Sequence, residues 1–352
     1  MLITILATAA VLGILIIVHE LGHFFAAKIS KVRVEVFSLG FWPKLVGKKI
    51  GDTDYRISWI PLGGYVKLAG MIDESMDGDT IKGEPWEFMS KTPLQKIFII
   101  TAGVIMNIVL AVVIFSILTF SMGIGEIGES TIISEVVPDY PALEAGLVSG
   151  DKVVSIDGNP ISTWVEMTEY IHSRPNTELE VSWERDGELF SEKIRTRAEK
   201  VPVDGKLQEL GMIGIRPEVT IRDAGFFESI QVGIGRTYLW GKLILTSLRM
   251  LVTGEASFRS VGGPIFIAQL AGDSARSGLD SLFNLIAILS INLAILNILP
   301  IPAFDGGHLI VIIIEWIKRG PLAVKTKMMI QQVGFAIFLV MAAFVIFNDL
   351  SR

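Results

Sequence analysis

The sequence predicts a multi-pass α-helical membrane protein with four spans, a membrane-associated β element and an inserted soluble α+β domain. Of the 352 residues, 51% are hydrophobic, a fraction that suits a membrane protein better than a soluble one. Apolar runs of spanning length occupy 2–27, 94–120, 281–317 and 328–347. Between them, 121–223 carries 20 acidic and 10 basic residues, so the rest of the chain is net basic although the whole has a charge of −6. This asymmetry predicts a polar domain on one side of a membrane and basic loops on the other.

The first apolar run contains no charge from Leu2 to Val18. It could be a signal peptide, but a basic start is missing and the apolar stretch continues to Ala27, so we interpret it as a retained span. Basic residues follow it directly, beginning with Lys28. By the positive-inside rule, this end is cytoplasmic and the N-terminus lies outside.

The segment 28–93 is predicted as a cytoplasmic-side, membrane-associated β element followed by a loop. Valines 32, 34 and 36 alternate with charged residues, and apolar strand-like stretches follow at 55–60 and 64–68. Because open strand edges are not tolerated against lipid, this element should pack on protein or line a wet cavity. In the second span, 94–120, the one strongly polar residue near the middle is Asn107, for which a helix–helix hydrogen bond is the favoured interpretation.

The last third of the chain alternates amphipathic and apolar segments. Residues 224–280 have apolar side chains at helical spacing with basic residues between them, which predicts membrane-surface helices. The third span, 281–317, is interrupted at 300–307 by two prolines and two glycines, and broken helices at membrane depth occur where they line a site. The loop 318–327 is basic and therefore cytoplasmic, and 328–347 returns outward as the fourth span.

The first span ends in the pattern H-E-x-x-H, formed by His19, Glu20 and His23. Positions four apart share a face of a helix, so both imidazoles can hold one metal ion, and the glutamate can take a proton from a water at that ion. Charged and metal-binding side chains are costly within lipid, so their presence there indicates a functional site.

A catalytic zinc site needs a third protein ligand. The chain has only two further histidines, and His172 lies in the outside domain. Asp305, in the broken third span and on the same membrane side as His19, is the favoured third ligand. His308, three residues further on, is the competing candidate. The ligand types favour zinc, although iron or cobalt would also bind such a set.

The soluble segment 121–223 reads as short strands joined by Asp-Gly turns, with one helix near 163–173. Its core, about 127–200, contains Ala145-Gly146-Leu147, then Gly150-Asp151, and then Ile156 and Gly158. This run resembles a PDZ domain of the bacterial protease type. Such domains bind a peptide terminus or extended segment at a strand edge, so a peptide or protein ligand is an implied partner. Under the predicted topology, this domain and both chain termini are extracytoplasmic.

The two membrane motifs, in their order around the inserted domain, resemble the site-2 protease family of intramembrane zinc metalloproteases, and most closely its RseP-type bacterial members. The second motif is N-x-x-P-x-P-x-x-D-G, running from Asn297 to Gly306. The resemblance implies a zinc ion held by His19, His23 and Asp305, with Glu20 as general base. It also implies that Asn297, Asn292 and the β element, at Gly64 and Tyr65, contact the substrate backbone.

The implied function is hydrolysis of peptide bonds within membrane spans, in regulated intramembrane proteolysis during a stress response. The implied substrates are single-span proteins already trimmed outside, such as anti-sigma factors, and signal-peptide remnants, in a bacterial cytoplasmic (inner) membrane. Many Gram-negative members carry two PDZ domains, whereas this chain has room for one. The alternative is a non-catalytic receptor or scaffold that acts through its PDZ domain, although such a protein has no need of Glu20. The absence of cysteine excludes a thiol nucleophile, and the acidic balance argues against nucleic-acid partners.

Overall fold

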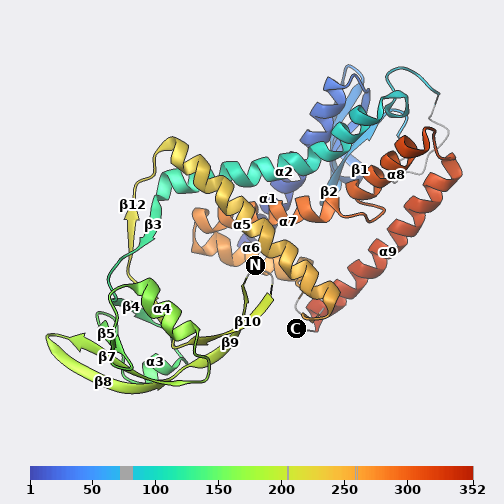
Figure 1. Cartoon of the computed structure of the whole chain (residues 1–352). Helices are drawn as coiled ribbons and strands as arrows, with labels where there is room; N and C mark the ends of the chain where they lie inside the picture. The colour runs from blue at the N-terminus through green and yellow to red at the C-terminus, as the bar shows by residue number, and fades with distance from the viewer. Residues whose placement is uncertain (72–81, 204–205, 258, 260, 352) are drawn as a thin grey trace. The chain divides into compact units, whose positions relative to one another are not determined.

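The computed structural model describes residues 1–71, 82–203, 206–257, 259 and 261–351 (Figure 1). The chain divides into two compact units. The first unit consists of Met1–Leu118 and Phe226–Arg352, and the second of Thr119–Gly225. The second unit is therefore inserted into the sequence of the first.

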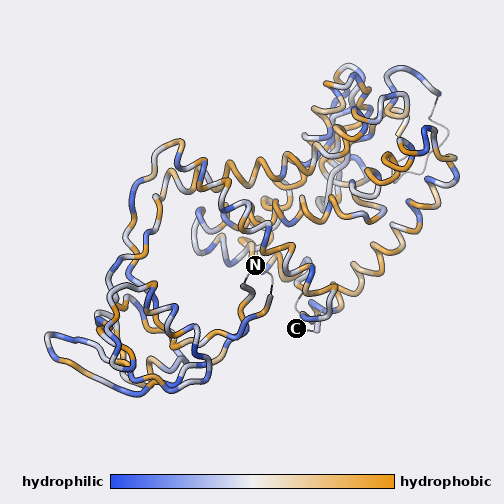
Figure 2. Tube along the Cα trace, in the orientation of Figure 1, coloured by the Kyte–Doolittle hydropathy of each residue, from blue (hydrophilic) through white to orange (hydrophobic). Residues whose placement is uncertain are grey.

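Long helices form most of the first unit. They are α1 (Leu2–Ile29), α2 (Pro93–Met122), α5 (Phe226–Thr253), α6 (Pro264–Ser277), α7 (Leu279–Ile298), α8 (Asp305–Lys318) and α9 (Val324–Leu350). By length and composition, α1, α2, α7 and α9 could each cross a membrane, and Figure 2 shows how hydrophobic residues dominate α2 and α9. Helices α1, α2 and α9 overlap the predicted first, second and fourth spans, while the predicted third span, 281–317, covers both α7 and α8.

The helices of the first unit enclose an apolar core. Val11 of α1, Phe115 of α2, Ala271 of α6 and Ile291 of α7 are buried together in it. Small residues allow the close approach, because a Cβ on Gly272 of α6 would lie 2.5 Å from the hydroxyl of Thr4. The segment 224–280, predicted to be amphipathic helices, contains α5 and α6.

The predicted β element is a long antiparallel hairpin of β1 (Val34–Ile50) and β2 (Thr53–Leu68). Its strands bend so that residues 34–39 pair with 64–68 on one side, and residues 36–39 also pair with 54–57 on the other. The second half of β1, 44–50, pairs with 53–58. The bend follows Gly40, whose φ of +89° is accessible to glycine and costly for other residues. A short 3-10 helix, η2 (Phe88–Ser90), precedes α2.

The second unit is a small α+β fold. Its elements are β3 (Ile124–Ile127), β4 (Ile133–Val136), α3 (Pro141–Glu144), β5 (Lys152–Ile156), β6 (Asn159–Pro160), α4 (Trp164–His172), β7 (Glu178–Arg185), β8 (Glu188–Arg195), β9 (Arg197–Val203), β10 (Lys206–Met212), β11 (Ile215–Pro217) and β12 (Val219–Arg222). The main sheet has the order β6-β5-β7-β8, and two-stranded pairs join β9 to β10, β4 to β11 and β3 to β12. Its core includes Leu147, Ile156, Met167 and Trp183.

Both predicted Asp-Gly turns have the backbone that hairpin turns require. Asp157 and Gly158 have φ values of +51° and +74°, and Asp186 and Gly187 have +52° and +84°. The second turn joins β7 to β8 directly. The helix predicted near 163–173 is α4, whose N-cap Thr163 accepts a hydrogen bond from the backbone N–H of Glu166.

One ion pair, between a half-buried arginine and a buried aspartate, fixes the sheet of the second unit to the loop that follows α3. Asp151 is completely buried and binds Arg185 at 2.7 Å, and it also accepts a hydrogen bond from the backbone N–H of Val148. Burial alone would raise the pKa of Asp151. The hydrogen bonds from Arg185 and Val148 outweigh that effect and hold this pKa below its usual range.

Candidate metal centre

The two histidines of the H-E-x-x-H motif lie on the buried side of α1. His19 and His23 are only 7% and 8% exposed, and their Nε2 atoms are 3.1 Å apart. When two ring nitrogens lie so close together in a site with little water, they need a shared partner such as a proton or a metal ion. The helix period places them there, because residues four apart lie one above the other on the same face.

A break between α7 and α8 brings a carboxylate to the same point. The backbone becomes extended at Leu299, where ψ is 146°, and α8 then begins at Asp305. Gly306 and Gly307 fit only without side chains, since a Cβ on either would lie within 2.6 Å of a backbone carbonyl oxygen in the break. The turn therefore packs tightly enough to place Asp305 Oδ2 3.2 Å from Nε2 of His19 and 3.4 Å from Nε2 of His23.

The three ligand atoms fit a zinc ion. They form a triangle with edges of 3.1, 3.2 and 3.4 Å. A tetrahedral zinc with bonds of about 2.1 Å spaces its ligand atoms by about 3.4 Å. In addition, Asp305 Oδ2 is buried and has no hydrogen-bond partner among the described residues, as expected of an oxygen reserved for a metal. His19, His23 and Asp305 could thus hold zinc and leave its fourth position open.

Helix α2 supplies the surroundings of both imidazoles. Nδ1 of His23 donates a hydrogen bond to the backbone carbonyl of Ile99 at 2.9 Å, which leaves Nε2 free for a metal. A Cβ on Gly103 would lie 2.5 Å from Nε2 of His23, and one on Gly22 would lie 2.4 Å from the carbonyl oxygen of Ala102. These two glycines let α1 and α2 touch at the level of the histidines.

Two asparagines also reach His19. Nδ2 of Asn297 is 3.2 Å from Nε2 of His19 and 3.5 Å from Nδ1 of the same ring. Nδ2 of Asn107 is 3.3 Å from Nδ1. The helix–helix hydrogen bond that the sequence favours for Asn107 is thus made between α2 and α1, and its partner is a candidate metal ligand. Asn292 precedes Asn297 by five residues, which turns it about 140° around α7, and its predicted role stays a prediction.

The hairpin passes directly against the motif helix. Gly64 in β2 lies beside Glu20, because a Cβ at Gly64 would be 3.3 Å from Cγ of Glu20 and 2.8 Å from the carbonyl oxygen of Ser38. The neighbouring Tyr65 pairs with Ser38 in the sheet and stacks its ring on Phe41. Of the predicted substrate-contacting residues, Gly64 thus lies next to the candidate general base, and Tyr65 is adjacent to it.

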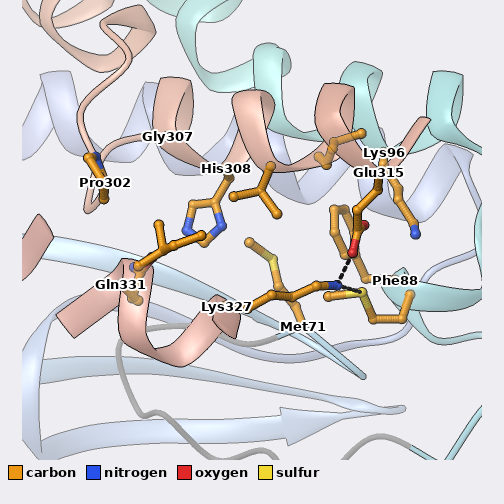
Figure 3. Close-up of a pocket in the computed structure, with 13 residues that line it drawn as sticks. Met71, Phe88, Lys96, Pro302, Gly307, His308, Glu315, Lys327 and Gln331 are labelled. Atoms are coloured by element: carbon orange, nitrogen blue, oxygen red, sulfur yellow. Dashed lines mark hydrogen bonds and ion pairs between the residues drawn. The ribbon is translucent and has the colours of Figure 1, made fainter. Parts of the chain in front are cut away.

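His308, the competing third ligand, lies in a different cavity (Figure 3). This cavity of about 30 Å³ is lined by residues of α8 and α9, including His308, Glu315, Lys327 and Gln331. Glu315 and Lys327 form an ion pair at 2.6 Å with side chains only 11% and 10% exposed. The structure therefore separates Asp305, beside the histidine pair, from His308, beside a buried ion pair.

Sequence reasoning missed Gly22 and Gly103, which shape this centre, and Ser290, which joins α7 to α2 next to it. Ser290 of α7 is fully buried and donates a hydrogen bond to the backbone carbonyl of Asn107 at 2.8 Å. A signal for Gly103 existed, because Gly103 and Asn107 are four apart in an otherwise apolar helix and so share one face. What the sequence could not provide is which helix this face meets.

Comparison with known proteins gives a consistent result over nearly the whole chain. Residues 7–341 match the sequence model of a protein family described as Peptidase family M50. A Clostridium perfringens protein to which zinc metalloprotease activity is ascribed is 34% identical, over 96% of this chain and 95% of its own length. The zinc metalloprotease RasP of Geobacillus kaustophilus is 29% identical, over 99% of this chain and 98% of its own length.

Solved structures are similar to a part of the chain. The PDZ domain of an SdrC-like protein from Listeria monocytogenes shares 22% identity, with 27% of this chain and 93% of that domain covered and a TM-score of 0.21. The corresponding domain from Listeria innocua shares 20% identity, with 27% and 99% covered and a TM-score of 0.22.

Proposed function

The chain belongs to peptidase family M50, the site-2 proteases, and is a zinc metalloendopeptidase of the membrane; on this basis we propose that it cuts peptide bonds inside the spans of single-span membrane proteins. The observation that carries the proposal is the position of the metal centre. His19 and His23 lie on α1, a helix long and apolar enough to cross a membrane, and they meet Asp305 beside α7, another such helix. Family membership makes the protein an enzyme, which disfavours the alternative of a non-catalytic scaffold.

The site residues take distinct roles in this proposal. His19, His23 and Asp305 hold the zinc ion, which when bound supplies Lewis acidity that makes a water more acidic and polarises a carbonyl. Glu20 accepts the proton of the attacking water and returns it to the leaving amine. Asn297, whose amide nitrogen lies 3.2 Å from Nε2 of His19, donates a hydrogen bond to the carbonyl oxygen as negative charge develops there.

The free edge of the hairpin offers a place for the substrate backbone. Within the described residues, the segment 64–68 has a strand partner on one side only, the segment 34–39. A substrate segment added to the open side would be extended, which exposes the carbonyls that a helical backbone hides. Strand pairing would offset part of the free-energy cost of unwinding the substrate helix. Since Gly64 lies against Glu20, this edge supports delivery of a carbonyl to the catalytic water.

The distribution of charge supports an orientation. Basic residues follow α1, flank the start of α2 and occupy the loop between α8 and α9, so we place these three regions in the cytoplasm. The second unit and both termini are then extracytoplasmic, and the metal centre lies towards the cytoplasmic side.

We propose that the second unit is a PDZ domain that binds a peptide or protein and that excludes substrates with a bulky extracytoplasmic part. Trimmed anti-sigma factors and signal-peptide remnants in a bacterial inner membrane fit such a filter, as part of regulated intramembrane proteolysis in a stress response.

The proposal is tested with the purified full-length protein in lipid vesicles. The substrates are tagged single-span helices with a short outer tail, and the matched controls carry a folded domain on that tail. We expect cleavage within the span of the short-tailed helices, little cleavage of the controls, and a loss of about 100-fold or more in the Glu20→Gln variant with zinc still bound. Cleavage by Glu20→Gln at the wild-type rate, or cuts confined to segments outside the span, would overturn the proposal.

A further inference from the structure

Asn107 is a strongly polar side chain buried beside the metal centre without a complete set of partners. Its residue is fully buried in α2. Its Nδ2 lies 3.3 Å from Nδ1 of His19, while its Oδ1 is buried and has no hydrogen-bond partner in the described part of the chain. An unpaired amide oxygen in an apolar interior costs free energy, on the order of 1–3 kcal/mol, so this side chain needs an explanation beyond packing.

The chemistry of a metal-bound imidazole requires the opposite arrangement of that amide. A neutral imidazole carries its hydrogen on one nitrogen only. If His19 binds zinc through Nε2, the atom that faces His23 and Asp305, its hydrogen is on Nδ1 and needs an acceptor. Rotation of the Asn107 amide by 180° exchanges its nitrogen and oxygen with little other movement. The oxygen then accepts the Nδ1 hydrogen, and the amide nitrogen takes the position for which the described residues offer no partner.

We propose that Asn107 is a positioning residue of the metal centre: its Oδ1 accepts a hydrogen bond from Nδ1 of His19 and thereby fixes the ring and its tautomer for zinc binding through Nε2. This inference rests on the proposed role of His19 as a ligand. It assigns to Asn107 the part that carboxylates or backbone carbonyls commonly take behind metal-bound histidines. The donor group of Asn297 is no substitute, because it lies nearer to Nε2, at 3.2 Å, than to Nδ1, at 3.5 Å.

The same helix acts in the same way on the second histidine. The backbone carbonyl of Ile99 accepts the hydrogen of His23 Nδ1 at 2.9 Å. Ile99 and Asn107 are two helical turns apart on α2, and Gly103 lies between them with no room for a side chain against the imidazoles. One face of α2 therefore orients both rings, once through the backbone and once through a side chain.

Ser290 holds this face of α2 in place and provides a matched control. Its hydroxyl donates to the backbone carbonyl of Asn107, not to the side chain. Ser290→Ala therefore removes a buried hydrogen bond at the same residue and leaves the Asn107 amide intact. A loss caused merely by disturbed packing between α2 and α7 would appear in this variant too.

The test measures zinc affinity in the purified full-length protein by competition with a chromogenic chelator, together with the visible absorption spectrum of the cobalt-substituted protein. Asn107→Leu keeps a similar volume and removes the acceptor, and Asn107→Asp supplies an acceptor without a donor. We expect the leucine variant to bind zinc about 10- to 100-fold more weakly and to show an altered cobalt spectrum. We expect the aspartate and Ser290→Ala variants to stay within about threefold of wild type, the scatter usual for independent small effects.

The outcomes separate this inference from the proposed function. Wild-type affinity in Asn107→Leu overturns the role of Asn107, as does a tenfold or greater loss in folded Asn107→Asp, which would mean that Nδ2 must donate. If the leucine variant does not fold, the aspartate variant alone decides. His19→Ala tests the premise: if it binds zinc as wild type does, or if wild type binds none, the ligand assignment itself fails.

Discussion

Oδ2 of Asp305, at the start of α8, lies 3.2 Å from Nε2 of His19, in the second half of α1. This contact joins the first and third predicted spans and completes a set of three ligand atoms. Of the two candidates that the sequence offers for the third ligand, the structure places only Asp305 here, because α8 begins at that residue and carries His308 into another cavity.

Asp305→Asn should abolish high-affinity zinc binding. The amide keeps the size of the side chain but removes the negative charge that offsets the charge of the ion. We expect zinc affinity to fall by more than about 100-fold, beyond the 10- to 100-fold typical of outer partners, and cleavage to fall with it. His308→Ala is the matched control and should keep its zinc. Chelator competition with both purified variants decides, and equal losses in the two would contradict the assignment.

The chemistry of the site could be predicted further than its geometry. Residue type and helical period are local, so the pairing of His19 with His23 follows directly from the sequence. Asp305 and His308 are both plausible on spacing alone, and only the packing of the break against α1 separates them. The contributions of Gly103 and Asn107 depend on which face of α2 meets α1, a tertiary contact that periodicity cannot provide.

Gly103→Ala should disturb the metal centre. Its Cβ would lie 2.5 Å from Nε2 of His23 and 2.7 Å from Cε1 of His19, so the imidazoles or α2 must move. We expect a destabilisation of about 1–3 kcal/mol, typical of overpacking, together with weaker zinc binding. Gly13→Ala on α1 is the control, because its Cβ meets no atom within 4 Å. Thermal unfolding and zinc affinity in detergent measure both effects, and similar behaviour of the two variants would count against the close helix contact.

Gly64→Ala should impair turnover and leave zinc binding unchanged. A Cβ there would lie 2.7 Å from Cγ2 of Ile16 and 2.8 Å from the carbonyl oxygen of Ser38, which pushes β2 away from Glu20. A displacement of that kind misplaces a substrate held on the strand edge, at a cost on the order of 10- to 100-fold in kcat/KM. Cleavage assays and chelator competition on the same preparation separate the two properties. Unimpaired cleavage would argue against substrate binding at this edge.

The fold of the hairpin shows the same limit of sequence information. Alternation at 32–36 and the apolar stretches at 55–60 and 64–68 predict strands, and both stretches lie within β2. The bend that lets 36–39 pair on both sides depends on contacts between distant parts of the hairpin. A period-two pattern indicates a strand and its two faces but not which strands become its neighbours.

Lys327→Met should destabilise the first unit because it leaves Glu315 buried without its cation. The pair is 2.6 Å apart and nearly inaccessible to solvent, and removing one partner of such a pair typically costs about 3–5 kcal/mol. The double variant Glu315→Leu with Lys327→Met removes both charges and should recover most of the loss. The unfolding temperatures of the two variants and of wild type measure both effects. If Lys327→Met is as stable as wild type, the ion pair does not contribute to the stability of the first unit.

Arg185→Leu should weaken the second unit in a pH-dependent way. In the folded protein, Arg185 and the N–H of Val148 hold the pKa of Asp151 below its usual range despite burial. A lowered folded pKa contributes stability that is fully present above the unfolded pKa, about 3.9, and is lost as the pH falls through the folded value. At pH 7 the variant leaves the buried Asp151 without its cation, so we expect a loss of about 3–5 kcal/mol. The difference from wild type should shrink as the pH falls below about 4, as measured by denaturant unfolding of the full-length protein followed by tryptophan fluorescence. A difference that stays constant between pH 7 and pH 3 would show that the ionised pair is not what stabilises this unit.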